Sequence, residues 1–251
     1  MAFLRDIVPY LDHLLYIHRF GDAPGAYNGL QLENSGKIEK IAAAVDACEA
    51  VIDRAAQVGR TLLLVHHGLF WGENRRWIGA TYRRFRSAIS GDLAIYSAHL
   101  PLDVHPRHGN NVLLAQACGF TRCQPFLEVS GTYVGVRVEV KLSRVDVLNR
   151  VAEAVCGGVH LASGGPETCC HVGIVSGSAG SKIAQAAADG IDTLITGEGA
   201  HWTCIAAEES RVNLIYAGHY ATETFGIRSV AKHLSEYLNL PWEFIDHPTG
   251  R

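Results

Sequence analysis

Short apolar runs that alternate with helix-like segments constrain the fold of this chain more than any other feature. In the first half, three runs have the length and composition of buried strands, and each precedes a segment with helical periodicity. The predicted strands span 40–46, 61–65 and 93–99, and the predicted helices span 48–59, 81–90 and 109–119. Because strand–helix alternation is typical of sheets with largely parallel strands, we predict an α/β fold.

The second half of the chain has a different pattern. Residues 131–140 alternate between apolar and polar side chains, as in a half-exposed strand. Ser143 has the position of a helix N-cap, because Asp146 follows three residues later. Strand and helix signals then alternate again over 169–190, 191–202 and 211–246. We predict two interlocked α/β lobes, lobe A at about residues 1–125 and lobe B at about 126–251.

The composition limits the classes of function. The chain has 251 residues and a formal net charge of −3, which does not favour nucleic-acid binding. Its seven cysteines are scattered without a CxxC pair, so we expect reduced thiols in a cytoplasmic protein. The N-terminus lacks a signal-peptide layout, and no apolar run reaches the length of a membrane span. Thirteen histidines stand out, which makes metal binding and proton transfer the leading chemical questions.

Two adjacent histidines end an apolar strand in LLLVHHGLFW, residues 62–71. His66 and His67 would point to opposite faces of a regular strand. Both can serve one site only if the chain turns, which Gly68 permits. A buried imidazole is costly without partners, so the pair consists either of metal ligands or of hydrogen-bonded structural histidines.

A second cluster of titratable side chains follows the next predicted strand. Residues 97–111 contain His99, Asp103, His105 and His108. Ligands of parallel α/β sheets collect beyond the carboxyl ends of the strands, which favours a binding role for the group as a whole. For His105 and His108 individually, a solvated loop that caps the next helix is the simpler interpretation.

A third strand end carries a histidine and a glutamate four residues apart. His219 and Glu223 would share one helical face and could clamp a metal ion, although helix capping explains the same spacing. Together, the three strand ends supply three imidazoles and two carboxylates as candidate ligands: His66, His67, Asp103, His219 and Glu223. This set suits two divalent transition ions better than one structural zinc. Water would complete the coordination of both ions, which is the arrangement used in metal-assisted hydrolysis.

Five segments together resemble the YbgI-like family, whose members are described as GTP cyclohydrolase 1 type 2 homologs and as NGG-interacting-factor-three-like proteins. The segments are NGLQLEN, LLLVHHGLFW, YSAHLPLDVHPRHGNN, ITGEGAHW and GHYATET, and they follow the order of the family over nearly the whole chain. The resemblance implies one family unit over residues 1–251, with a dinuclear metal site between two α/β lobes. It also implies a toroidal homohexamer.

The resemblance further implies a role for each metal ligand. His67 and Asp103 would hold one ion. His66 and His219 would hold the other, and Glu223 would bridge the two. The two divalent ions of each chain would be Zn, Fe, Mn, Ni or Co, because all of these accept mixed nitrogen and oxygen ligands.

Two further histidines are candidates for catalysis. His99 would orient a ligand or a water molecule, and His201 would carry protons or contact the substrate. A structural role explains each of them equally well. Glu198 is a candidate outer partner for a metal-bound imidazole. The glycine-rich turn at 175–182 lacks Walker A spacing, so a tight corner explains it better than a phosphate cradle.

These observations predict a metal-dependent hydrolase in which metal-activated water attacks a small molecule, such as a nucleotide or a modified purine. We expect a homo-oligomer without membrane or nucleic-acid partners. The alternative function is a non-catalytic, metal-binding oligomeric scaffold, or a toroid that binds proteins or DNA. The slightly acidic composition gives DNA binding little electrostatic support.

Overall fold

A computed structural model describes residues 1–71 and 76–250 of the chain. The chain divides into two compact units, each with its own large sheet. Unit 1 comprises Met1–Leu102 and Gly226–His247, and unit 2 comprises Asp103–Phe225 with the last residues from Pro248 onward. The prediction of interlocked lobes concerns how two halves fit together, and it stays a prediction.

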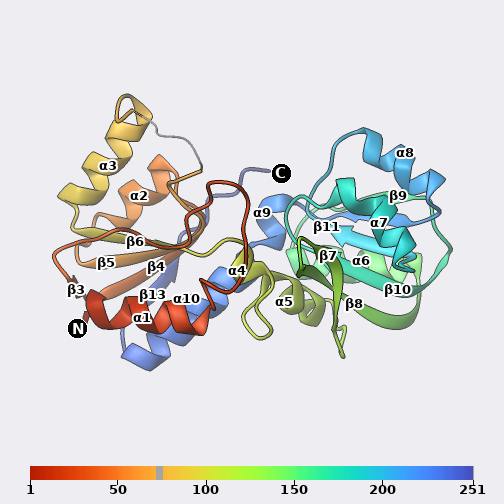
Figure 1. The fold of residues 1–251 in the computed structure, drawn as a ribbon, viewed down its shortest axis with the longest axis horizontal. Coiled ribbons are helices and arrows are strands. Elements are labelled where there is room, and N and C mark those ends of the chain that lie inside the picture. The colour runs from red at the N-terminus through yellow and green to blue at the C-terminus, as the bar shows by residue number, and fades with distance from the viewer. Residues whose placement is uncertain (72–75, 251) are drawn as a thin grey trace. The chain divides into compact units, whose positions relative to one another are not determined.

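Unit 1 contains a five-stranded sheet with the strand order β13-β4-β5-β6-β2 (Figure 1). The first four strands run parallel, as predicted, and β2 pairs antiparallel to β6. The sheet consists of β2 (Gly29–Leu32), β4 (Lys40–Asp46), β5 (Thr61–His67), β6 (Leu93–Ser97) and β13 (Trp242–Phe244). A separate pair is formed by β1 (Ala2–Phe3) and β3 (Lys37–Ile38).

Helices cover both faces of the unit 1 sheet (Figure 1). Alternate residues of each strand point to opposite faces, which gives two apolar layers. Leu62 and Leu64 face α1 and α10, whereas Leu63 and Val65 face α2 and α3. The helices are α1 (Leu4–Leu14), α2 (Glu49–Ala55), α3 (Ala80–Ser90), α4 (Leu100–Asp103) and α10 (Thr224–Leu238), of which α4 and α10 begin in one unit and end in the other.

Unit 2 contains a six-stranded sheet with the order β7-β8-β10-β11-β12-β9. Only the β10–β11 and β11–β12 pairs are parallel among its described strands, so the prediction of largely parallel pairing is wrong for this sheet. The two-residue turn Ser130–Gly131 has φ angles of 50° and 81°, which closes β7 and β8 into an antiparallel hairpin. The strands are β7 (Gln124–Val129), β8 (Thr132–Ser143), β9 (His160–Ser163), β10 (Thr168–Val175), β11 (Thr193–Thr196) and β12 (Asn213–Tyr216).

Helices also cover both faces of the unit 2 sheet. One face packs against α5 and α6, and the other packs against α7 and α8. The predicted cap is confirmed, because the Asp146 backbone N–H donates to Ser143 Oγ at 3.0 Å. The helices are α5 (Asn110–Ala117), α6 (Arg144–Val155), the short 3₁₀ turn η1 (Gly180–Lys182), α7 (Ile183–Ala188), α8 (Trp202–Glu209) and α9 (His219–Thr222). Among all the residues described, no helix combines the length and apolar character that crossing a bilayer requires.

Candidate metal centre

The carboxyl ends of the parallel strands in unit 1 bring three histidines together. His66 and His67 are the last residues of β5, and His99 follows β6. The ring centroids of His66 and His67 lie 4.7 Å apart, and those of His66 and His99 lie 5.0 Å apart. One nitrogen from each of the three rings lies within 4.8 Å of the others, so the group could hold a metal ion.

Each of these three rings is fixed by a hydrogen bond at Nδ1. His66 donates to the carbonyl oxygen of Ala98 at 2.9 Å. His67 donates to Asp46 Oδ1 at 2.8 Å, across the register that pairs the last residues of β4 and β5. A carbonyl or carboxylate oxygen only accepts, so the proton lies on Nδ1 and the neutral ring carries its lone pair on Nε2. This tautomer is the one that a second-sphere acceptor selects for metal binding through Nε2.

His99 has the same arrangement with a buried carboxylate. Its Nδ1 donates to Asp22 Oδ1 at 2.7 Å, and Asn28 donates to the other oxygen of Asp22 at 2.8 Å. Burial raises the pKa of Asp22. The hydrogen bond and charge of His99 lower it, as do the hydrogen bonds from Asn28 and the Ala23 backbone N–H, and together they hold this pKa below its ordinary value. Asp22 is therefore an ionised acceptor at neutral pH. The ring of Trp71 stands edge-on to His99 at 5.0 Å and forms an aromatic wall of the group.

A second set of candidate ligands lies in unit 2, where Gly218 turns the chain from β12 into α9. His219 Nε2 lies 3.1 Å from Glu223 Oε2, although α9 ends at Thr222. Its Nδ1 donates to Glu198 Oε1 at 3.0 Å, so Glu198 is an outer partner of this imidazole, as predicted. The hydrogen bond to Glu223 raises the pKa of His219 to about 9, Glu198 adds to the effect, and burial opposes it.

Asp103 belongs to the same unit and is held by neutral donors. Its Oδ1 accepts from Asn110 Nδ2 at 2.8 Å and from Ser176 Oγ at 2.9 Å. Asn111 donates to the Asp103 carbonyl oxygen at 3.0 Å, which ties the backbone to the start of α5. Both asparagines and Ser176 are buried. The orientation of this carboxylate is therefore fixed by the unit 2 core.

Comparison with known proteins assigns the chain to a family. Residues 2–249 match the family described as Duf34/NIF3 (NGG1p interacting factor 3). The chain belongs to the Duf34/NIF3 family. The predicted resemblance is thereby confirmed, and a solved structure described as protein ybgI of unknown function superimposes on all of this chain with a TM-score of 0.92 and 30% identity.

Further Duf34/NIF3 relatives match over nearly their full length. A Deinococcus radiodurans protein named GTP cyclohydrolase 1 type 2 homolog is 42% identical over 248 residues, which cover 98% of this chain and 93% of that protein. The crystal structure of TTHA1606 from Thermus thermophilus is 37% identical to this chain and has a TM-score of 0.91. The superposition covers 100% of both chains. The mixed α/β fold is therefore that of the family.

The other predicted histidines of this Duf34/NIF3 chain lie in different environments. His201 is exposed and immediately precedes α8. His105 is buried, and its Nδ1 accepts the backbone N–H of His108 at 2.8 Å and that of Arg107 at 3.2 Å. His105 therefore organises the loop before α5. The prediction that His105 and His108 lie in a solvated loop is wrong, because both side chains are buried.

Several residues of this Duf34/NIF3 site were not predicted from the sequence. They are Asp22, Asp46, Asn110, Asn111, Ser176 and Gly177. The turn-rich segment before β2 contained Asp22, but nothing in the linear sequence indicates which histidine it contacts. The position of Asp46 at the end of a strand parallel to the His66–His67 strand was a signal that could have identified it.

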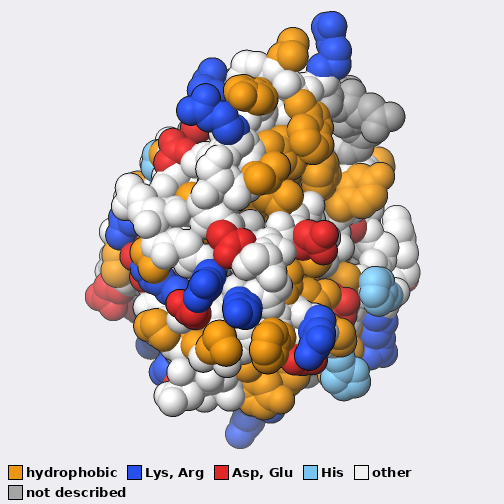
Figure 2. Space-filling model, turned by 90° about the vertical axis from the view of Figure 1, so that its left-hand side faces the viewer, with side chains coloured by type: hydrophobic (Ala, Val, Ile, Leu, Met, Phe, Trp, Pro, Cys, Tyr) orange, Lys and Arg blue, Asp and Glu red, His pale blue; other side chains and the backbone are white. Residues whose placement is uncertain are grey.

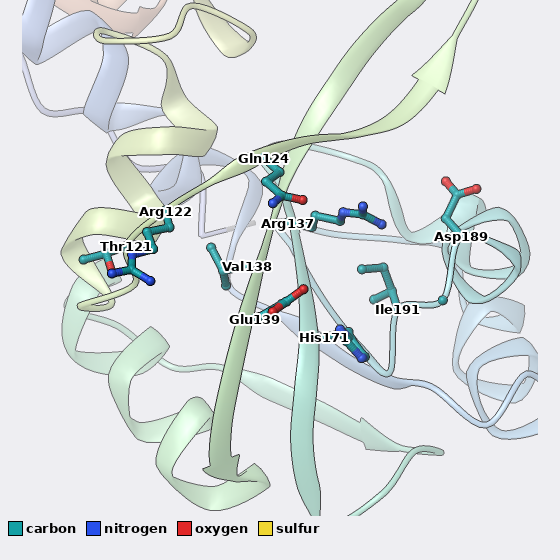
Figure 3. Close-up of a pocket in the computed structure, with 10 residues that line it drawn as sticks. Thr121, Arg122, Gln124, Arg137, Val138, Glu139, His171, Asp189 and Ile191 are labelled. Carbon is teal, nitrogen blue, oxygen red and sulfur yellow. The ribbon is translucent and has the colours of Figure 1, made fainter.

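The Duf34/NIF3 chain also has a polar cavity of about 680 Å³ within unit 2. Figure 3 shows Arg137 and Glu139 on β8, with His171 on β10, among its lining residues. None of the predicted metal ligands lines this cavity. It is therefore separate from the ligand set of unit 2.

Proposed function

We propose that this Duf34/NIF3 protein is a metal-dependent hydrolase whose two divalent ions are held by His66, His67, Asp103, His219 and Glu223. The observation that carries the proposal is the state of the histidines. His66, His67 and His219 all donate through Nδ1 to a carbonyl or carboxylate oxygen, which leaves Nε2 as the nitrogen that would bind the metal.

The course of the chain supports the proposal that both ligand sets serve one centre. The chain passes from unit 1 to unit 2 between Leu102 and Asp103, and it returns between Phe225 and Gly226. Asp103 is thus the first residue of unit 2, and Glu223 lies three residues before Gly226, where unit 1 resumes. Both carboxylates are therefore close in sequence to the two points at which the chain crosses from one unit to the other.

The donor set fits divalent transition ions, because it combines neutral imidazoles with carboxylates. Such ions would act as Lewis acids and make a water molecule nucleophilic near neutral pH. Asp46 and Glu198 accept from Nδ1 of His67 and His219, which orients Nε2 of each ring for an ion. In the metal-free protein His219 Nε2 lies 3.1 Å from Glu223 Oε2, and its proton would leave when an ion binds. We further propose that His99 orients the water or the substrate and that His201 transfers protons.

The proposed substrate is a small molecule of the nucleotide or modified-purine class. The name shared by relatives, GTP cyclohydrolase 1 type 2 homolog, supports a purine nucleotide. Trp71 beside His67 and His99 supports a planar substrate, since an aromatic wall can stack or pack edge-on against a base.

Metal content and activity together test this function. Wild-type protein purified anaerobically is loaded with a single metal, its stoichiometry is measured, and a nucleotide panel is screened by mass-resolved product detection. We expect more than one ion per chain and a product that His67→Ala and Glu223→Ala abolish. His18→Ala is the matched control for unit 1, because His18 is exposed, and His171→Ala is the control for unit 2.

Two results would contradict the proposal in different ways. A stoichiometry at or below one ion per chain in metal-replete protein would contradict the dinuclear centre. Metal binding that depends on His67 and Glu223, with no product from any nucleotide, would favour the non-catalytic scaffold instead.

We also propose that the chain assembles into a homohexamer. Unit 1 exposes large apolar side chains on and beside α3, including Trp77 at 58%, Tyr82 at 50% and Ile89 at 60%. Figure 2 shows hydrophobic side chains gathered in the upper part of the face that it presents. Exposed apolar patches are typical of association surfaces. Sedimentation analysis tests the assembly, and a monomer at micromolar concentration would contradict it.

A further inference from the structure

The glycine-rich turn between β10 and α7 lies against both carboxylates of the unit 2 ligand set. Ser176 Oγ lies 2.9 Å from Asp103 Oδ1 and 3.0 Å from Asn111 Oδ1. A hydroxyl has one proton to donate, and an ionised carboxylate is the stronger acceptor. Asn111 Oδ1 already accepts the Ser176 backbone N–H at 2.7 Å. The Ser176 hydroxyl therefore donates to Asp103.

Gly177 lies against the other carboxylate. Its φ angle is +66°, a conformation that favours glycine. A Cβ atom at this position would collide with Glu223 Oε1 and would lie 3.4 Å from His219 Nε2. Glu223 is only 3% exposed, so its carboxylate has little space into which it could withdraw. The absence of a side chain at position 177 is thus a condition for the observed position of Glu223.

Four backbone N–H groups of this turn donate to acceptors within the protein. Ser176 N donates to Asn111, Gly177 N donates to Thr222 Oγ1 at 3.0 Å, and Ala179 N donates to Thr196 Oγ1 at 3.0 Å. Gly180 N donates to the carbonyl oxygen of Glu198 at 3.2 Å. A phosphate cradle requires such N–H groups to point at the ligand. These four N–H groups therefore donate within the chain and do not form a phosphate cradle.

We propose that the Ser176–Gly177 turn positions the two carboxylate ligands of unit 2. Ser176, together with Asn110, fixes the plane of the Asp103 carboxylate by engaging Oδ1 twice. Gly177 provides the space in which the Glu223 carboxylate lies beside His219. The inference rests on the proposed metal centre and assigns the glycine-rich turn a role as its outer support.

The test measures metal affinity with Co²⁺ as the probe, by competition against a chromophoric chelator, on the full-length protein. We expect Ser176→Ala to weaken Co²⁺ binding about 10–100-fold, the usual cost of removing an outer partner of a metal ligand. Ser176→Thr keeps the hydroxyl and should restore affinity. Ser178→Ala is the matched control, because Ser178 is an exposed serine of the same turn. Gly177→Ala should weaken binding and alter the visible spectrum of bound Co²⁺.

Melting temperatures of the metal-free variants separate positioning from general destabilisation. A purely structural role would lower the melting temperature of Ser176→Ala and leave Co²⁺ affinity and spectrum unchanged, which would overturn the inference. If Ser176→Ala does not fold, the Co²⁺ affinity and spectrum of Gly177→Ala make the test, because a Cβ atom there would collide with Glu223 Oε1. Wild-type protein that binds no Co²⁺ would overturn the proposed function and this inference together.

Discussion

At the scale of single residues, the acceptor behind each imidazole determines how that imidazole can bind a metal. His67 and His99 each donate to an aspartate, and His66 donates to a main-chain carbonyl oxygen. The carbonyl of Ala98 cannot be removed by substitution, whereas the aspartates can. The aspartates therefore offer the sharper test of how the ligands are oriented.

Asp46→Asn tests the acceptor behind His67. The amide retains the shape of the carboxylate, but it can present an NH₂ group to Nδ1 and thereby move the ring proton to Nε2. We expect metal affinity to fall about 10–100-fold with little change in melting temperature. Asp53→Asn, at an exposed site on α2, is the control. An unchanged affinity for Asp46→Asn would show that His67 is not a ligand through Nε2.

The pKa of His219 gives a prediction for the metal-free protein. A histidine proton NMR titration should show this ring titrating at about 9, because Glu223 and Glu198 stabilise its charged form. Since the pKa is raised on folding, the stability from this pair is fully present below the unfolded value of about 6.5 and is lost as the pH rises through about 9. In Glu223→Gln the midpoint should fall. A titration midpoint near 6.5 for His219 in the wild type would contradict its contact with Glu223.

At the scale of elements, an ion pair links β13 to the neighbouring strand β4. Lys40 Nζ lies 2.6 Å from Glu243 Oε1, and both side chains are largely covered, with 21% and 29% exposure. The hydrogen bond and charge of Lys40, aided by Arg54, lower the pKa of Glu243. The pair therefore stabilises the attachment of a strand that is distant in sequence.

Glu243→Gln should lower stability by about 0.5–1 kcal/mol near neutral pH, measured by urea denaturation. Because folding lowers the pKa of Glu243, its contribution is present above the ordinary carboxylate value and is lost as the pH falls through the folded value. The difference from the wild type should therefore shrink in acid. Glu39→Gln is the control, because its pair with Arg60 is 49% exposed on each side and should contribute nothing measurable. A difference that does not depend on pH would contradict the ion-pair origin.

The elements also show how far sequence reasoning can go. The buried strands β4, β5 and β6 were predicted, because apolar runs between helical segments depend only on local sequence. The short edge strand β13 lies within 211–246, where alternating strand and helix signals were predicted, but its place beside β4 depends on the return of α10 to unit 1. The antiparallel hairpin of β7 and β8 was missed, since Ser130–Gly131 is a weak turn signal. Asp22 and Ser176 were missed because only tertiary structure brings them to His99 and Asp103.

At the scale of the whole molecule, the proposed centre makes the two units depend on the same ions. A ligand that binds only the folded protein stabilises it by about 2.7 kcal/mol at a concentration about 100 times its dissociation constant. If His67 of unit 1 and His219 of unit 2 serve one centre, this stabilisation must appear in both units. If each unit binds metal alone, the stabilisation of a unit must depend only on the ligands of that unit.

Hydrogen–deuterium exchange of metal-free and metal-loaded protein distinguishes these possibilities. Loading should slow exchange in peptides that contain the end of β5 and in peptides that contain α9. His66→Ala removes a unit 1 ligand from the ion assigned to His219, so it should also abolish much of the protection at α9. His18→Ala should leave both segments protected. Protection at α9 that survives His66→Ala would mean that unit 2 binds its ion without a ligand from unit 1. The joint centre would then be wrong, because an ion held by ligands from both units binds more weakly when either unit loses a ligand.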